Sequence, residues 1–245
     1  MQTTSNINIK QWAEVLEMLS RLPKPPRRML LYGPAGTGKT TYALSLSPES
    51  ERLTLTQGQF QDALYGKFLL RDGSTFWANG PATRAAVKGI PFVIDEIHMG
   101  GSELNAPLMA ILDDENVSRL NLDNGQSIVP AQGFRVIATM NGSPEQLYGP
   151  LLDRFDIVLR AGTPHTGILR RLSPEGAAFI ANMMSNAPDT DNWTPEISPR
   201  RQISFENLRG QGVPEPLAAD LVFGEGQGRT VLNAMVEAAR NNIVS

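Results

Sequence analysis

Gly33-Pro-Ala-Gly-Thr-Gly-Lys-Thr40 is the stretch that decides the fold. It fits the pattern G-x-x-x-x-G-K-[ST], follows a short apolar run and opens a helical segment. Glycines let backbone N–H groups close around phosphate oxygens, and the N-terminus of the next helix adds partial positive charge. The stretch predicts a phosphate-binding loop between a strand and a helix. A glycine-rich turn with a chance lysine is the alternative.

Within this loop, Lys39 is expected to reach the β- and γ-phosphates of a nucleotide, and Thr40 to ligate Mg²⁺. The motif therefore predicts a bound nucleotide and Mg²⁺, and by itself it does not indicate which base or which reaction. The residues expected to bind the nucleotide are Gly33, Pro34, Ala35, Gly36, Thr37, Gly38, Lys39, Thr40 and Thr41.

Adjacent carboxylates follow a second apolar run, Ile90-Pro-Phe-Val-Ile-Asp95-Glu96. This pattern places Asp95 at the carboxyl end of a buried strand, the edge at which open α/β sheets bind ligands. Asp95 can hold Mg²⁺ through its water shell, and Glu96 can orient or deprotonate an attacking water. An acidic strand end that caps the next helix is the alternative. A glutamate here favours phosphoryl transfer to water over transfer to a metabolite hydroxyl, as in a small-molecule kinase.

Short apolar runs alternate with helical segments through the first two thirds of the chain. This alternation is typical of a parallel sheet with helices on both faces. Turn residues at 71–74 and 123–125 predict two β-hairpins inserted into this α/β core. Expected strands are Met29–Tyr32, Arg52–Leu55, Phe92–Asp95, Phe134–Thr139 and Ile157–Leu159, with hairpins Phe68–Leu70/Thr75–Trp77 and Ser118–Leu122/Gln126–Val129. Expected helices are Asn8–Leu22, Lys39–Ser45, Ala82–Val87 and Ser102–Asp114.

The pattern changes to all-helical after about Pro164. Ser173-Pro174 and Ser198-Pro199 each predict an N-cap followed by proline at the first helical position. Further helices are expected at Glu215–Val222 and Arg229–Asn242, with Asn186–Glu196 as a loop. We therefore predict an α/β core at residues 1–163 and a small all-α lid at residues 164–245.

Composition narrows the class of protein. The 245 residues include no cysteine and two histidines, and the net charge is −3. These counts exclude a disulfide framework and thiolate metal sites, and they argue against a multi-histidine metal site and a broad nucleic-acid-binding surface. The N-terminal residues MQTTSNINIK contain no apolar core of a signal peptide, and no apolar stretch in the chain approaches the length of a membrane span. We expect a cytoplasmic protein.

Beyond these motifs, the sequence resembles the MoxR branch of the AAA+ ATPases over roughly Arg27 to Arg209. That branch includes rubisco-activating, nitric-oxide-reductase-associated and gas-vesicle ATPases. The acidic motif and following helix match Asp95 to Leu112, and the family's sensor strand matches Phe134-Arg-Val-Ile-Ala-Thr-Met-Asn141. The arginine-finger motif matches Leu151-Leu-Asp-Arg-Phe155, and the second sensor matches Ser198-Pro-Arg200.

The resemblance implies catalytic roles for Glu96, Asn141, Arg154 and Arg200. Asn141 would hydrogen-bond the attacking water; its alternative is a turn asparagine before Gly142. Arg154 would act on a neighbouring subunit's nucleotide; its alternative is an ion pair with Asp153 or Asp156. For Arg200 the alternative is a surface arginine, with Arg201 as a competitor.

The resemblance also implies a five-stranded sheet of order 5-1-4-3-2 and a homo-oligomeric ring, commonly a hexamer. The function implied is that of a chaperone that remodels a protein client, often with a von Willebrand A-domain partner. One departure from the family is His98-Met99, which replaces an Asn-Arg pair. Guanine-reading motifs are absent, which favours adenine, so the expected cofactors are ATP and Mg²⁺.

Other functions remain open at this point. One is a nucleic-acid-stimulated motor or restriction-type subunit, which the acidic composition disfavours. A small-molecule kinase and a non-catalytic switch are weaker, because a full set of hydrolytic residues is present. The aromatic residues around the first hairpin, Tyr65, Phe68, Phe76 and Trp77, would either grip a polymer in a ring pore or pack within the protein.

Overall fold

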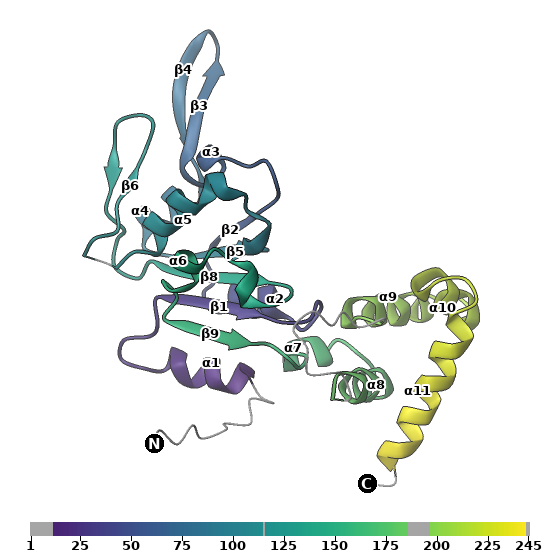
Figure 1. Ribbon diagram of the computed structural model, residues 1–245. Helices are drawn as coiled ribbons and strands as arrows, with labels where there is room; N and C mark the ends of the chain where they lie inside the picture. Colours follow the sequence, from purple (N-terminus) through teal and green to yellow (C-terminus); the bar gives the residue numbers. More distant parts are fainter. Residues whose placement is uncertain (1–11, 115, 186–196, 244–245) are drawn as a thin grey trace, which may run out of the picture. The chain divides into compact units, whose positions relative to one another are not determined.

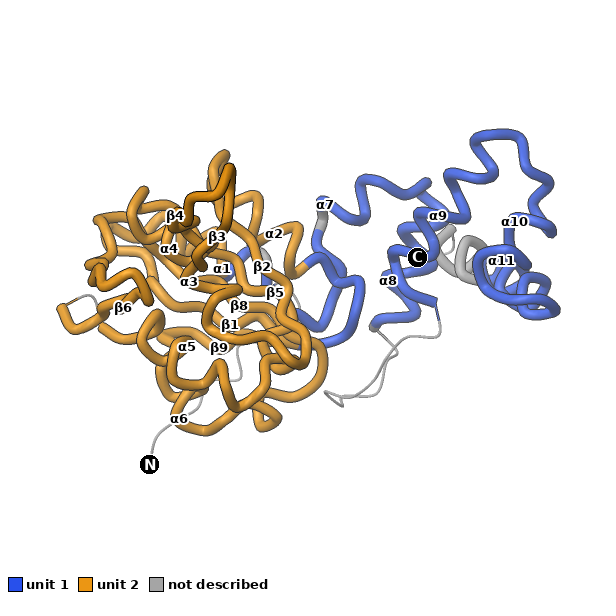
Figure 2. Tube along the Cα trace, turned by 90° about the horizontal axis from the view of Figure 1, so that it is seen from above, with its two compact units in different colours: residues 1–15, 33–38, 161–245 blue, residues 16–32, 39–160 orange. Residues whose placement is uncertain are grey.

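The computed structural model describes residues 12–114, 116–185 and 197–243. The chain divides into two compact units, residues 1–15, 33–38 and 161–245 in the first and residues 16–32 and 39–160 in the second (Figure 2). The predicted core at residues 1–163 and lid at 164–245 differ from this division, because the C-terminal part begins at residue 161 and residues 1–15 group with it. Residues 33–38, at the centre of the phosphate loop, group with the C-terminal part of the chain.

The second unit is built on a five-stranded parallel sheet (Figure 1). Its order, β2-β5-β8-β1-β9, is the predicted 5-1-4-3-2 order with the hairpin strands left out of the count, so the fold prediction is confirmed. The strands are β1 (Arg28–Tyr32), β2 (Glu51–Thr54), β5 (Pro91–Asp95), β8 (Arg135–Met140) and β9 (Ile157–Arg160).

Burial explains why these runs form central strands. All five residues of β5 are buried, and so are five of the six residues of β8, because strands of a parallel sheet are covered on both faces. Phe92, Ile94, Val136 and Ala138 belong to the main apolar core of the unit. The surrounding helices are α2 (Lys39–Ser45), α4 (Pro81–Lys88), α5 (Asn105–Leu112, preceded by the 3₁₀ turn Ser102–Leu104) and α6 (Gly149–Leu152).

The parallel arrangement gathers the functional candidates at one edge of the sheet. β5 ends at Asp95, and Asn141 directly follows β8. β5 and β8 are hydrogen-bonded neighbours, with Val93 opposite Ile137. The carboxyl ends of adjacent parallel strands lie side by side, so the acidic pair and the asparagine meet.

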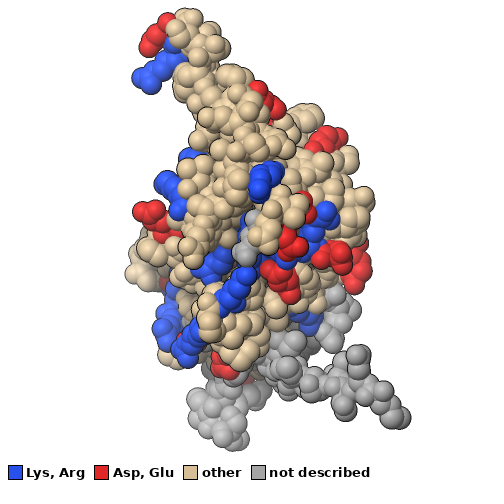
Figure 3. Space-filling view, turned by 90° about the vertical axis from the view of Figure 1, so that its left-hand side faces the viewer, with Lys and Arg blue, Asp and Glu red and all other residues tan. Residues whose placement is uncertain are grey.

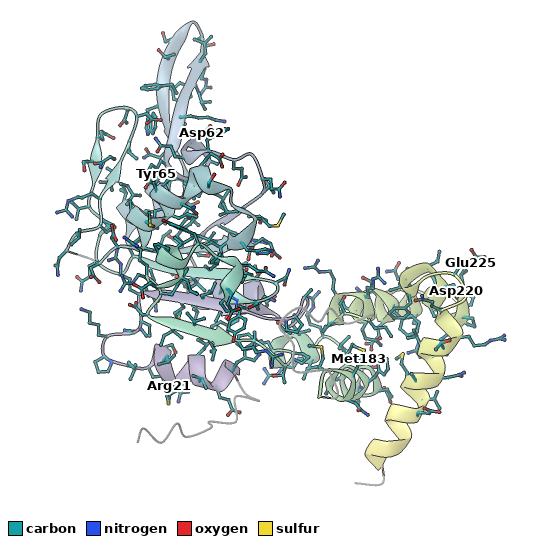
Figure 4. The ribbon with its side chains drawn as sticks, viewed as in Figure 1. Arg21, Asp62, Tyr65, Met183, Asp220 and Glu225 are labelled. Carbon is teal, nitrogen blue, oxygen red and sulfur yellow. The ribbon has the colours of Figure 1, made fainter. Side chains whose placement is uncertain are left out.

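Both predicted hairpins are present. β3 (Gly66–Arg71) and β4 (Ser74–Asn79) form a long hairpin that projects from the unit (Figure 1). β6 (Leu120–Asn121) and β7 (Ser127–Ile128) form a shorter one than expected. At the base of the long hairpin, α3 (Gln61–Tyr65) ends in Tyr65 (Figure 4). The side chain of Tyr65 is 4% exposed, and its hydroxyl donates to the carbonyl of Pro107 at 2.9 Å. Tyr65 is therefore an anchor, unlike Phe68 and Phe76, which are 54% and 43% exposed.

The first unit is helical in its C-terminal part, as predicted. Phe205 and Phe223 pack together in its core, with ring centroids 5.5 Å apart. Ser198 caps its helix by accepting a hydrogen bond from the amide of Arg201 at 3.3 Å, and the hydroxyl of Ser173 accepts from the amide of Gly176 at 3.1 Å. The helices are α7 (Thr166–Leu169), α8 (Pro174–Ser185), α9 (Pro199–Gly210), α10 (Glu215–Phe223) and α11 (Gly228–Ile243).

Two predicted segments fall partly or wholly outside the described residues. The N-terminal helix was expected at Asn8–Leu22, and α1 covers Trp12–Ser20. The loop predicted at Asn186–Glu196 lies outside the described residues. None of the helices in the described part of the chain is long and apolar enough to cross a membrane.

Candidate nucleotide-binding site

The loop between β1 and α2 requires glycine at several positions. Gly33, Gly36 and Gly38 have φ angles of 127°, 82° and 97°, which L side chains rarely adopt. Space is also limited, because a Cβ atom on Gly36 would lie 2.8 Å from the Cδ of Pro199. A Cβ atom on Gly33 would lie 3.0 Å from the carbonyl oxygen of Ala161. The motif glycines are therefore fixed by both backbone conformation and close packing.

The segment after β9 holds this loop in place. The amide of His165 donates to the carbonyl of Thr37 at 2.7 Å. The indole of Trp12 donates to the carbonyl of Thr163 at 2.7 Å, and its ring centroid lies 5.7 Å from that of His165. Burial, followed by the charge of Arg170, lowers the pKa of His165. These contacts join residues far apart in the sequence, and no local pattern indicated them.

In the second unit, three of the candidate residues form one hydrogen-bonded chain. Lys39 Nζ donates to Asn141 Oδ1 at 2.9 Å, and Asn141 Nδ2 donates to Glu96 Oε1 at 2.6 Å. Lys39 is only 6% exposed, and burial lowers its pKa to about 8 against the opposing charges of Glu96 and Asp95. A buried, easily deprotonated ammonium and a carboxylate are thus held on either side of one amide.

Asp95 is the centre of a second cluster. Its Oδ1 accepts hydrogen bonds from the hydroxyls of Thr40 at 2.6 Å and Thr139 at 2.8 Å. Its Oδ2 pairs with the guanidinium of Arg52, while the side chain of Asp95 is only 4% exposed. Arg52 and Thr139 were not among the predicted site residues. Arg52 lies on β2 and Thr139 on β8, the two strands that pair with β5, and no local motif marked either residue.

The Thr40–Asp95 pair fits a magnesium site. Mg²⁺ prefers oxygen ligands and is commonly bound by one or two carboxylates together with nucleotide phosphates and waters. A hydroxyl and a carboxylate 2.6 Å apart, next to a phosphate loop in sequence, supply such a partial ligand set. Among the described residues no group of three or more acidic or histidine side chains could hold a metal alone, so the phosphates would complete the coordination.

Glu96 has an unusual backbone. Its φ and ψ are 54° and 47°, and Asp72 in the hairpin turn is the other non-glycine residue with positive φ among those described. Such conformations cost free energy and cluster at functional sites. His98, which departs from the family pattern, places its Nδ1 3.5 Å from Glu96 Oε2. His98 Nδ1 makes no hydrogen bond at this distance, so the left-handed turn and the amide of Asn141 set the direction of the Glu96 carboxylate.

Arg154 pairs with a residue that the sequence did not indicate. Its Nε donates to Asp113 Oδ1 at 2.9 Å, and its Nη1 donates to the carbonyl of Pro150 at 2.8 Å. The alternative to the finger role, an ion pair with Asp153 or Asp156, is not what the structure shows, since Arg154 pairs with Asp113 and Asp156 with Arg28. Asp113 ends α5, and its approach to Arg154 depends on tertiary packing of α5 against α6.

Arg200 is described with the first unit. It lies in the first turn of α9 and is exposed, directly after the Ser198-Pro199 pair that packs against Gly36. Its neighbour Arg201 is exposed as well. Arg200 directly follows Pro199, which lies against Gly36 of the phosphate loop. Its role as second sensor stays a prediction.

The glycine-rich loop joins a strand to a helix, and carboxylates stand at the end of a neighbouring strand of the five-stranded parallel sheet. These features define a P-loop nucleotide-binding protein. The model of the AAA domain (dynein-related subfamily) matches residues 28–155, a little over half of the 245-residue chain. The chain therefore belongs to this AAA family, and its resemblance to the MoxR branch is confirmed.

Comparisons with known proteins also give a curated relative and a solved structure. Protein NorQ of Paracoccus denitrificans is 32% identical over 118 residues, which cover 46% of this chain and 43% of NorQ. The alignment thus spans less than half the length of that relative. Among solved structures, the RuvB Holliday junction branch migration motor of Thermotoga maritima matches with a TM-score of 0.47 and 20% identity, over 93% of this chain and 67% of that one.

Proposed function

We propose that the chain binds ATP through residues 33–40 and hydrolyses it. The observation that carries this proposal is the hydrogen-bonded chain Lys39–Asn141–Glu96. It places a cation suited to the phosphates and a carboxylate suited to water activation on the two ends of one asparagine side chain. A structural ion pair would need no such intermediate amide.

Each residue has a physical task in this proposal. Lys39 binds the β- and γ-phosphates, and Asn141 orients the attacking water toward the γ-phosphate. Glu96 takes the proton of that water as it attacks, which is the role of a general base. Thr40 and Asp95 would hold Mg²⁺, whose contribution is to offset charge on the phosphate oxygens.

Glu96→Gln tests the hydrolytic part of the proposal. The amide keeps the size of the side chain but cannot accept the proton, so turnover should fall by roughly 10²–10⁴ while ATP binding persists. Glu103→Gln, an exposed glutamate on the following 3₁₀ turn, is the matched control and should retain full turnover. Unchanged turnover in Glu96→Gln would show that Glu96 is not the activating residue.

We further propose that the protein acts as a homo-oligomeric ring, on the model of its family, with Arg154 serving the nucleotide of an adjoining subunit. A guanidinium stabilises the charge that spreads over the transferred phosphoryl group. The side chain of Arg154 is half-buried, with 31% of its surface accessible, which leaves it able to contact a neighbouring subunit. We propose that this ring is a MoxR-type chaperone that remodels a protein client, as the family resemblance implies, with a von Willebrand A-domain protein as a candidate partner.

The long hairpin is the candidate element for contact with that client. Its shaft carries exposed apolar side chains with few charges, and charged groups gather near its tip (Figure 3). Phe68→Ser should weaken stimulation of ATP hydrolysis by a protein client and leave basal hydrolysis unchanged. Strong stimulation by single- or double-stranded nucleic acid instead would favour the nucleic-acid motor.

A further inference from the structure

The guanidinium of Arg154 is fixed at two points by acceptors from different elements. Asp113, at the end of α5, accepts from Nε at 2.9 Å, and Pro150, within α6, accepts through its carbonyl from Nη1 at 2.8 Å. A guanidinium is planar and its donors point in fixed directions. Two bonds to different nitrogens therefore define both the plane and the direction of the group.

Asp113 is itself firmly held. Its carbonyl accepts from Arg27 Nη1 at 3.3 Å, and the carbonyl of Leu112 accepts from Arg28 Nη1 at 2.8 Å. Cationic side chains stabilise the carbonyl end of a helix, and these two tie the end of α5 to the start of β1. Arg28 is in turn bound by the carboxylate of Asp156. The acceptor for Arg154 thus has a fixed position in the unit.

The arrangement leaves a donor of Arg154 available. The hydrogen bonds of its side chain to the described part of the chain use Nε and Nη1, and the terminal Nη2 makes none there. The side chains of Arg154 and Asp113 are 31% and 34% exposed, so the pair lies at the surface. Acidic and basic side chains lie close together on the face of the core below the hairpin, with no large field of one sign (Figure 3).

We propose that Asp113 is the positioning residue of Arg154, orienting its guanidinium toward the phosphate of an adjoining subunit. The inference rests on the proposed function of Arg154 as a finger acting between subunits. The residue that it adds to the site, Asp113, would act through Arg154 and not by contact with the nucleotide or the water. Orientation of a reacting group before the reaction is a large part of rate enhancement, and a small misplacement costs up to about 10²-fold.

The test compares three variants of the full-length chain. Asp113→Ala removes the acceptor and should lower kcat by roughly 10- to 100-fold with little change in KM for ATP. Asp113→Asn keeps an acceptor oxygen without the charge and should restore part of the loss. Asp114→Ala is the matched control, because Asp114 is the next residue, is 76% exposed and pairs with Arg28 at 3.3 Å; it should retain wild-type kcat.

A mixing experiment separates positioning from damage to the fold. Lys39→Ala subunits lack a working phosphate loop but present an intact Arg154. Mixed with Asp113→Ala subunits, they should restore hydrolysis. The Lys39→Ala subunit supplies a correctly oriented Arg154 guanidinium to the intact phosphate loop of a neighbouring Asp113→Ala subunit. No recovery, under conditions where Arg154→Ala and Lys39→Ala subunits do recover activity together, would show that Asp113→Ala damages its own site and would overturn the inference.

The remaining outcomes are equally distinct. Wild-type or raised kcat in Asp113→Ala, with Arg154→Ala inactive, overturns the positioning role and leaves the proposed function intact. Normal hydrolysis by Arg154→Ala alone, or a dead mixture of Arg154→Ala and Lys39→Ala subunits that demonstrably co-assemble, overturns the finger itself. The inference about Asp113 then falls with it.

Discussion

The side-chain amide of Asn141 donates a 2.6 Å hydrogen bond to the carboxylate of Glu96. The same amide accepts from Lys39, so the candidate base and the candidate phosphate-binding cation are linked through one neutral side chain. The link passes between the ends of two adjacent strands, which are fixed to each other by the sheet. A substitution at Lys39 should therefore alter the hydrogen bonding of Glu96, and a substitution at Glu96 that of Lys39.

Asn141→Ala should lower turnover while leaving ATP binding largely intact. The alanine removes the donor that orients both the water and the Glu96 carboxylate, whereas Lys39 and the loop glycines remain. Single-turnover hydrolysis and equilibrium binding of a fluorescent ATP analogue measure the two effects separately. Asn124→Ala, at an exposed hairpin turn, is the control. A loss of binding equal to the loss of turnover would contradict the orienting role.

Lys39→Ala should abolish tight ATP binding. Lys39 is expected to supply the direct positive charge on the β- and γ-phosphates, and the remaining loop offers backbone amides alone. Titration calorimetry with ATP and Mg²⁺ measures the loss, and Lys67→Ala on the exposed hairpin is the control. Near-normal affinity in Lys39→Ala would refute the assignment of the phosphate loop.

The lowered pKa of Lys39 predicts that ATP binding takes up protons in alkaline solution. In the nucleotide-free protein this pKa is about 8, against 10.5 for an ordinary lysine, and bound phosphates would raise it. ATP affinity should therefore fall as the pH rises above about 8, with proton uptake on binding. Calorimetry in buffers of different ionisation enthalpy measures the uptake, and Lys39→Arg should remove it.

The same shift affects stability with a defined sign. Between about pH 8 and 10.5 the unfolded chain binds more protons at Lys39 than the folded chain does, so this group makes the nucleotide-free protein more stable as pH rises through that window. For the affinity prediction above, an ATP affinity that does not change between pH 7 and 10 would show that Lys39 does not titrate in that range.

Arg52 should raise the Mg²⁺ concentration that the site requires. Its guanidinium pairs with Asp95, the proposed magnesium ligand, and its side chain is 50% exposed and thus has room to leave. In Arg52→Gln the carboxylate loses its competing cation, so half-saturation by Mg²⁺ should shift to lower concentration. Quenching of a bound fluorescent nucleotide during Mg²⁺ titration measures it. An unchanged or higher midpoint would contradict the competition.

ATP should promote assembly of the isolated protein. If nucleotide lies between subunits, binding stabilises the interface by mass action. Sedimentation velocity with ATP and Mg²⁺, using Glu96→Gln to prevent turnover, should show species larger than those without nucleotide. Lys39→Ala is the control and should not respond. A strict monomer across accessible concentrations would argue against a ring of this chain alone.

Much of the core could be predicted from the sequence because its signals are local. The glycine loop, the apolar run ending at Asp95 and the hairpin turns each specify backbone conformation over a few residues. The sheet order followed from the family resemblance. α2 matches its predicted bounds, Lys39–Ser45, and β5 extends the predicted strand by one residue.

The unpredicted features depend on tertiary contact or belong to very short helices. The pairing of Arg52 with Asp95 joins neighbouring strands, and that of Arg154 with Asp113 joins two helix ends. For Tyr65 and the other aromatic residues of the hairpin both substrate contact and packing were left open, because sequence position cannot show that the Tyr65 hydroxyl meets the carbonyl of Pro107. α3, α6 and α7 were missed because helices of four or five residues carry little periodicity.

The long hairpin has a practical consequence for handling the protein. Its cross-strand register puts Phe68 beside Trp77 on one face and Leu69 beside Phe76 on the other, so neither face is polar. Both outer edges of this two-stranded sheet are also open to pairing. Exposed apolar surface of this kind favours self-association. Concentrated solutions of the purified chain should therefore aggregate through this hairpin before the rest of the fold loosens, and solubility will be set by it rather than by thermal stability.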